Sequence, residues 1–219
     1  MAIKISVTGL AKFMKSGPAT QRTLLRSYKF PTDKDGKKRP PIVRYSEARA
    51  AIKKYHESGN DVATLLQAVS DLQHKLTTID PDKDTGRIRD NIRAVNAYMK
   101  YFSKSKFAVL DNPRPKYRHS TVEVSTSPDL FVDEGGTKKL IKLDFNSSPL
   151  DLDSIKVILK VMHEASALIG LGVDPKNVVY LDVSRNEQHS GAKLNKQLKR
   201  DIDAACETIE DIWPRVKQG

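Results

Sequence analysis

The chain has 219 residues, of which 38% are hydrophobic and 30% are charged, and its formal net charge is +11 at pH 7. This length is enough for a sizeable core in one large domain or in two small ones. The hydrophobic fraction is too high for a fully disordered chain. No stretch approaches the roughly 18 consecutive apolar residues of a membrane span, and the first ten residues do not resemble a signal peptide. We therefore expect a globular cytoplasmic protein that does not enter a membrane.

Positive charge is concentrated in the N-terminal half. Residues 1–106 contain 22 Lys and Arg residues against 10 Asp and Glu residues, whereas residues 107–219 contain 16 against 17. Such an asymmetry is typical of a surface that neutralises phosphates. Nucleic acid, DNA or RNA, is therefore the expected partner. The alternatives are a basic face without any polyanionic partner and a helical scaffold whose basic half binds an acidic protein.

The N-terminal half is predicted to be mostly helical after a short strand at 3–7. Apolar residues recur at helical spacing around 8–14, 18–30, 45–57, 61–76 and 88–102. Thr8, Pro18 and Asp61 are suitable residues for starting three of these helices. The run 33–41 has too few apolar residues to pack and is expected to form an exposed basic loop. The expected nucleic-acid contacts are five basic residues in and after this loop: Lys37, Lys38, Arg39, Arg44 and Arg49.

The pattern changes at Asp111-Asn112-Pro113-Arg114-Pro115, because this sequence cannot continue a helix. We therefore divide the chain into a basic helical region, 1–110, and an α/β core, 111–219, which could also form one compact unit. Strands are expected at 140–145 and 178–183, and 121–124 and 130–132 are expected to form one strand or two, with a bend at Ser127-Pro128 between them. Helices are expected at 151–170 and 194–212. We expect these strands to form one sheet, with the last strand parallel to the one before it and the first of these helices packed on the sheet. Cys206 lies in the last helix and is the only cysteine, which excludes an internal disulfide.

This order of elements resembles the core of the PD-(D/E)XK nuclease-like superfamily. The residues that carry the resemblance are Ser127-Pro128-Asp129 at a bend before one strand and Leu140-Ile141-Lys142 in the strand after a hairpin. The resemblance covers about 115–213 and implies an α+β protein in which a ββαβα restriction-endonuclease-like core with a mixed sheet follows the helical region. Members hold a divalent metal with the aspartate after the proline and with an acidic residue two positions before the lysine. Asp129 and Lys142 match, but Leu140 stands where the acidic residue is expected.

The opening of the chain is similar to the start of RecB-type members of the same superfamily. In those members a serine-rich strand end leads into a short helix, as Ile5-Ser6-Val7-Thr8 would here. Gly17 stands where the family has the cysteine of a Cys-Pro step.

The resemblance implies a magnesium-dependent nuclease, provided that another carboxylate replaces the missing one. Magnesium prefers oxygen ligands, and a single carboxylate holds it poorly. Asp144 shares a strand face with Lys142, and Glu47 could approach from an upstream helix. The candidate metal ligands are therefore Asp129, Asp144 and Glu47, and the candidate catalytic residues are Asp129, Lys142 and Asp144.

Each of these residues also has an ordinary structural interpretation. Asp129 follows a proline and could belong to a turn, Lys142 and Asp144 could face solvent on a half-exposed strand, and Glu47 lies where the first turn of a helix favours negative charge. The alternative to a nuclease is thus a non-catalytic binding or assembly protein that keeps the fold with a degraded site. The leucine at position 140 favours this alternative.

Overall fold

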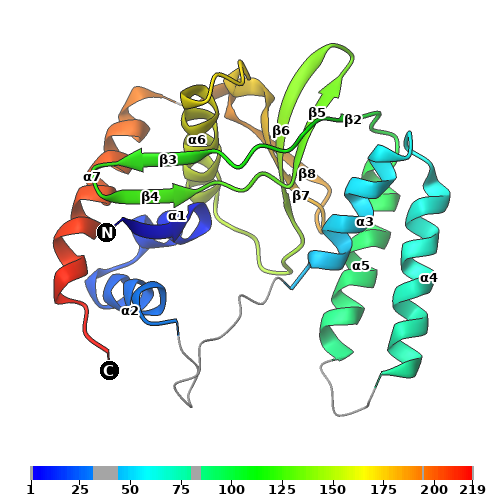
Figure 1. Ribbon diagram of the computed structural model, residues 1–219, viewed down its shortest axis with the longest axis horizontal. Coiled ribbons are helices and arrows are strands. Elements are labelled where there is room, and N and C mark those ends of the chain that lie inside the picture. The colour runs from blue at the N-terminus through cyan, green and yellow to red at the C-terminus, as the bar shows by residue number, and fades with distance from the viewer. Residues whose placement is uncertain (1, 32–43, 80–84, 194, 219) are drawn as a thin grey trace.

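The computed structural model describes residues 2–31, 44–79, 85–193 and 195–218, and the fold is α+β with two sheets (Figure 1). The larger sheet has five strands in the order β2-β5-β6-β7-β8. The smaller sheet has three strands in the order β1-β4-β3. Among the described residues, no helix combines the length and the apolar character needed to cross a bilayer.

The larger sheet contains the predicted hairpin and crossover. Its strands are β2 (Ala108–Val109), β5 (Leu130–Glu134), β6 (Thr137–Asp144), β7 (Val178–Asp182) and β8 (Glu187–Ser190). Gly135 and Gly136 have positive φ angles in the turn between β5 and β6, which explains the glycine pair there. β7 is buried along its whole length and pairs with β6 in parallel, as predicted.

The smaller sheet shows that the single-sheet prediction is wrong. The strand expected at 121–124 is β4 (Val122–Ser125), which pairs in parallel with β1 (Ile3–Ser6) and antiparallel with β3 (Lys116–His119). Val122 and Val124 align with Ile3 and Ile5 in this register, so both strands bury the same apolar face. β1 precedes β4 by more than 100 residues in the sequence. Because β4 lies outside the larger sheet, the resemblance to the nuclease-like core loses the support that one sheet would have supplied.

The seven helices of the described residues lie in two groups, one on each side of the larger sheet (Figure 1). α1 (Val7–Lys15), α2 (Pro18–Lys29), α6 (Leu152–Leu168) and α7 (Lys196–Ile212) enclose one core together with the smaller sheet. α3 (Ser46–Glu57), α4 (Val62–Thr78) and α5 (Thr85–Phe102) form a bundle on the opposite face (Figure 1). Short 3-10 turns occur at Pro175–Asn177, Gly191–Lys193 and Trp213–Arg215. Each long helix matches a predicted one, although α1 begins at Val7 with Ser6 as its N-cap rather than at Thr8.

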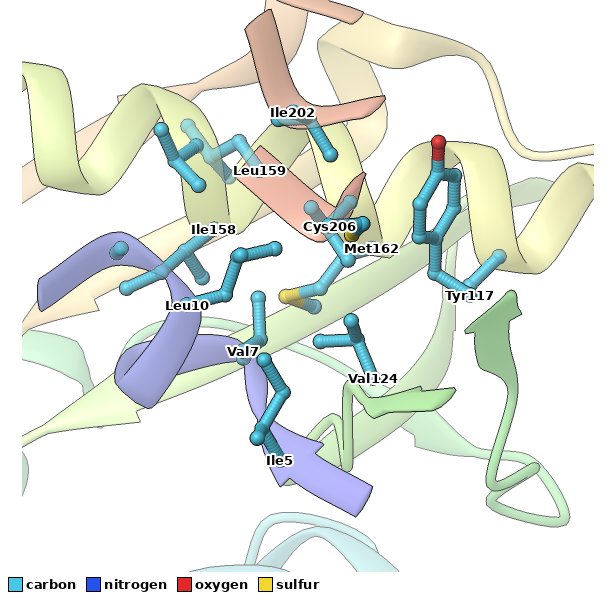
Figure 2. Packing of buried hydrophobic residues seen from close by; sticks show 14 of the residues in the cluster. Ile5, Val7, Leu10, Tyr117, Val124, Ile158, Leu159, Met162, Ile202 and Cys206 are labelled. Carbon is cyan, nitrogen blue, oxygen red and sulfur yellow. The ribbon is translucent and has the colours of Figure 1, made fainter. Parts of the chain in front are cut away.

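Both cores contain residues from both sides of position 110. In the first core, Ile5 and Leu10 pack with Val124, Met162 and Cys206 (Figure 2). In the second core, residues of the α3–α5 bundle pack on the side chains that alternate along β6 and β7 toward the bundle. The Cys206 thiol is buried in this core, and burial raises its pKa to about 12.

Gly9 is needed where α1 meets α2. The Tyr28 hydroxyl lies 2.7 Å from the Ser6 hydroxyl, and a methyl group on Gly9 would overlap the Tyr28 ring end, with the phenolic oxygen only 2.1 Å from the added carbon. Gly17, at the N-cap of α2, has no atom within 4 Å of the corresponding position. The two glycines therefore provide a matched pair for testing this contact.

We predict that Gly9→Ala lowers the free energy of unfolding by about 1–3 kcal/mol, because Tyr28 must move and its hydrogen bond is lost. Gly17→Ala should cost at most about 1 kcal/mol, because it only weakens a cap. Urea unfolding followed by circular dichroism measures both. Equal decreases in the free energy of unfolding of the two variants would contradict the packing described for Gly9.

Candidate functional site

A pocket of about 800 Å³ opens at the carboxyl ends of the parallel strands β6 and β7. Its walls come from α1, from the N-terminal end of α3, from α5 and from the segment 145–150 that connects β6 to α6. The carboxyl ends of parallel strands are a frequent place for ligand sites in α/β sheets. The volume is in the range of pockets that hold small ligands or single groups of larger ones.

The pocket is rich in cationic side chains. Five of them contribute to its lining: Lys12, Arg44, Arg49, Arg93 and Lys142. Two carboxylates, Asp90 and Asp144, also line it. The lining therefore has an excess of positive charge.

Asp90 on α5 holds two of these cations. Its carboxylate is buried, with 5% of the side chain exposed, and it accepts a hydrogen bond from Arg44 Nε at 2.6 Å and another from Arg93. Burial would by itself raise the pKa of Asp90, but the hydrogen bonds and charges of the two arginines outweigh burial and lower it. The two arginines remain 62% and 76% exposed. Asp90 thus fixes two guanidinium groups that stay open to solvent.

Asp129 holds the second pair of cations at the start of β5. Its carboxylate is 8% exposed and lies 2.7 Å from Arg49 Nε and 3.1 Å from Lys142 Nζ. The backbone N–H of Leu143 donates to Asp129 Oδ2 at 2.8 Å. The contact with Arg49 is an ion pair that lacks hydrogen-bond alignment, and the Arg49 guanidinium also lies over the Phe145 ring, 5.4 Å from its centroid. The pairing of Asp129 with Lys142 brings together the two residues that match the nuclease-like motif.

Asp144 has different partners. Its carboxylate accepts hydrogen bonds from the Tyr180 hydroxyl at 2.5 Å and from the backbone N–H and side-chain amide of Asn146. Burial, followed by the hydrogen bond to Asp144, raises the pKa of Tyr180. Asp144 is therefore a buried lining residue whose carboxylate oxygens both already accept hydrogen bonds.

Glu47 does not face the pocket. It lies in the first turn of α3, where Arg87 of α5 donates to it at 2.5 Å and Lys75 of α4 lies at 3.8 Å. Burial raises its pKa, but the hydrogen bond from Ser46 and the charges of Arg87 and Lys75 lower it overall. The structure thus places Glu47 in an ion-pair network within the helical bundle.

Leu140 lies in the core rather than at the site. It is fully buried, and in the register of the larger sheet it lies between Phe131 and Val178, all three in the first core. A glutamate at this position would place a carboxylate among apolar side chains, which is strongly unfavourable. Replacing Leu140 with an acidic residue is therefore not a simple way of restoring a metal ligand.

The candidate metal ligands do not fit a magnesium ion in this arrangement. In the part of the chain that the structure describes, no three His, Cys, Asp or Glu side chains group closely enough to bind a metal. Asp129 is paired with two cations, Asp144 is bonded to a phenol and an amide, and Glu47 lies in the bundle. Magnesium needs carboxylate oxygens that can enter a near-octahedral shell, and these oxygens are engaged elsewhere.

Sequence reasoning identified part of the site. Of the five residues predicted to contact nucleic acid, Arg44 and Arg49 line the pocket, whereas Lys37, Lys38 and Arg39 lie outside the described residues. It missed Lys12, Asp90 and Arg93. Asp90 and Arg93 are three residues apart on one helix, which is a local signal for an ion pair, but the pairing of Asp90 with Arg44 spans 46 positions and has no local signal.

Comparison of the sequence with known proteins adds no family. A scan against protein-family models finds no match, and a search of curated proteins finds none either. The resemblance to the nuclease-like superfamily therefore depends on Asp129, Lys142 and the order of elements. The functional interpretation depends on the geometry of the pocket.

We predict that Asp129→Ala lowers the free energy of unfolding by about 2–4 kcal/mol, because it leaves two neighbouring cations and a backbone N–H without their common acceptor. Asp71→Ala is the control, since Asp71 is exposed on α4 and accepts only from Gln67 among the interactions described, so its loss should cost about 0.5 kcal/mol or less. Thermal and urea unfolding measure both. A small loss for Asp129→Ala would mean that the carboxylate does not hold Arg49 and Lys142 in solution.

Proposed function

We propose that the protein binds nucleic acid through the cationic pocket and that binding uses arginine and lysine side chains in place of a metal ion. The observation that carries this proposal is the arrangement of four cations around two buried carboxylates, Asp90 and Asp129. Each carboxylate neutralises one charge of its pair. A positive charge therefore remains at each pair, on side chains that line a hollow surface.

The fixed geometry of these cations suits phosphate binding. Arginine presents a planar set of donors that matches phosphate oxygens. A guanidinium that is already oriented loses less conformational freedom on binding than a free one. Arg44 and Arg93 combine this orientation with high side-chain exposure.

The distribution of charge along the chain supports the same proposal. The excess of Lys and Arg lies within residues 1–106, and α1, α3 and α5, which supply most of the pocket's cations, belong to this part of the chain. A concentrated positive field raises the rate at which a polyanion reaches the site. Local geometry and the long-range field thus favour the same class of partner.

The relation to the PD-(D/E)XK superfamily is part of the proposal. The β5–β6 hairpin, the α6 crossover to parallel β7 and the contact between Asp129 and Lys142 support a nuclease-like core. Arg49 contacts the carboxylate that would hold the metal, and Leu140 replaces the second carboxylate. These replacements favour the alternative in which the fold is kept for binding and the catalytic site is degraded.

We predict that the double variant Lys12→Gln, Arg93→Gln weakens binding to a 20-nucleotide oligonucleotide about tenfold. It should also reduce the slope of log affinity against log salt by about two, because two phosphate contacts are lost. Arg44 stays in place in this variant, so Asp90 keeps one cationic partner. Fluorescence anisotropy across a salt series measures both quantities.

The matched control is Lys53→Gln, Lys176→Gln, which removes the same charge from exposed positions outside the pocket. It should change the slope much less. Equal effects of the two double variants would mean that binding is a diffuse property of the basic surface. Replacing Lys37, Lys38 and Arg39 by Ala in the same series measures the contribution of the basic segment expected from the sequence.

A nuclease is the second candidate, and the 3.1 Å contact between Asp129 and Lys142 is the observation that favours it. Our account predicts no cleavage of single- or double-stranded DNA or RNA with magnesium or manganese. Cleavage that stops with a chelator and disappears in Lys142→Ala would instead establish the enzyme. Lys142→Ala is the sharper variant because Asp129 keeps Arg49 as a partner.

A further inference from the structure

The cationic pocket also has an aromatic and apolar wall. Tyr45 and Phe145 both line it, with ring centroids 5.2 Å apart and planes at 39°. Phe145 is a buried residue of the second core, whereas Tyr45 is only half-buried. Ala94 and Ala97 of α5 leave space beside these rings because their side chains are small. The Tyr45 ring thus adds an aromatic surface to a pocket that is also lined by the exposed side chains of Arg44 and Arg93.

We infer that the pocket receives one unpaired nucleotide of a single strand, with the base against Tyr45 and the adjoining phosphates on Arg44, Arg93 and Lys12. This inference rests on the proposed function and specifies its ligand. Base stacking on an aromatic side chain, combined with cations that follow the backbone, is the usual physical basis of single-strand binding. The pocket supplies both elements within one volume of about 800 Å³.

A paired duplex does not match this shape as well. In a duplex both faces of each base are covered by its neighbours, so a base must leave the stack before it can contact an aromatic ring. Leaving the stack costs a few kcal/mol in a duplex and much less in a single strand. A pocket lined by an aromatic ring therefore favours the unpaired form, while the cations that line it attract both forms.

The test compares a fluorescent single strand with a blunt duplex of the same length and sequence by anisotropy at a fixed salt concentration. We expect the single strand to bind about tenfold or more tightly than the duplex. Tyr45→Ala should weaken single-strand binding about tenfold through lost stacking and leave duplex binding within twofold. Tyr45→Phe should retain single-strand binding, because stacking does not need the hydroxyl.

Two further variants keep the test decisive if Tyr45→Ala is poorly folded. Ala97→Phe fills the pocket from α5 without changing charge, and it should reduce the preference for the single strand. Tyr101→Ala is the control: Tyr101 is an exposed aromatic residue on the same helix, outside the pocket and next to Lys100. It should leave both affinities unchanged.

The outcomes separate this inference from the function on which it rests. Equal affinity for the two forms, with no effect of Tyr45→Ala or Ala97→Phe, would overturn the inference and leave nucleic-acid binding intact. Absence of binding to either form would overturn both. Free thymidine monophosphate should compete only weakly, and competition at the affinity of the oligonucleotide would mean that the ligand is a free nucleotide rather than a strand.

Discussion

The ion pairs of Asp129 are the interaction on which the arrangement of the site depends. Asp129 directly precedes β5. Its carboxylate accepts a hydrogen bond from the backbone of β6 and pairs with one cation from β6 and one from α3. It therefore connects the helical bundle to the hairpin of the larger sheet at the place where the pocket forms. Asp90 likewise connects α5 to the segment before α3, because its carboxylate accepts a hydrogen bond from Arg44. Without these two buried carboxylates, Arg44, Arg93, Arg49 and Lys142 would lose the acidic partners that offset their mutual repulsion.

This arrangement differs from a metal site in its consequences for chemistry. A magnesium ion bound to carboxylates concentrates charge at one point and can stabilise the charge that develops during phosphodiester cleavage. Guanidinium and ammonium groups spread a similar charge over several donors, which suits recognition of phosphates in their ground state. Arg49 beside Asp129 and Leu140 in the core are both consistent with a site that binds a strand and leaves it intact.

Much of the fold could be predicted because its signals are local. The caps at Asp61 and Asp151, the glycines at 135 and 136 and the continuous burial of β7 follow from the chemistry of single residues or short patterns. The pairing of β4 with β1 could not be predicted in this way, because two short alternating strands more than 100 residues apart carry no mark of their partner. The strands β3 and β8 are short and largely polar, so they lack the alternation by which strands are recognised.

The site was predictable only in part, because several of its contacts join residues that are far apart in the sequence. Asp129 and Lys142 were identified through a motif, and their contact is formed. The neutralisation of Asp129 by Arg49 depends on how α3 packs against the end of the sheet, which the sequence pattern does not encode. Asp144 shares the expected strand face with Lys142, but the phenol of Tyr180 on the neighbouring strand engages it.

The central claim is that arginine and lysine side chains, rather than a metal ion, hold the phosphates. The most direct measurement is the affinity for one single-stranded oligonucleotide in excess chelator and in magnesium, at matched ionic strength. We expect the same affinity in the two conditions, because the cations of the pocket belong to the protein. Binding that requires magnesium and is lost in chelator would contradict it.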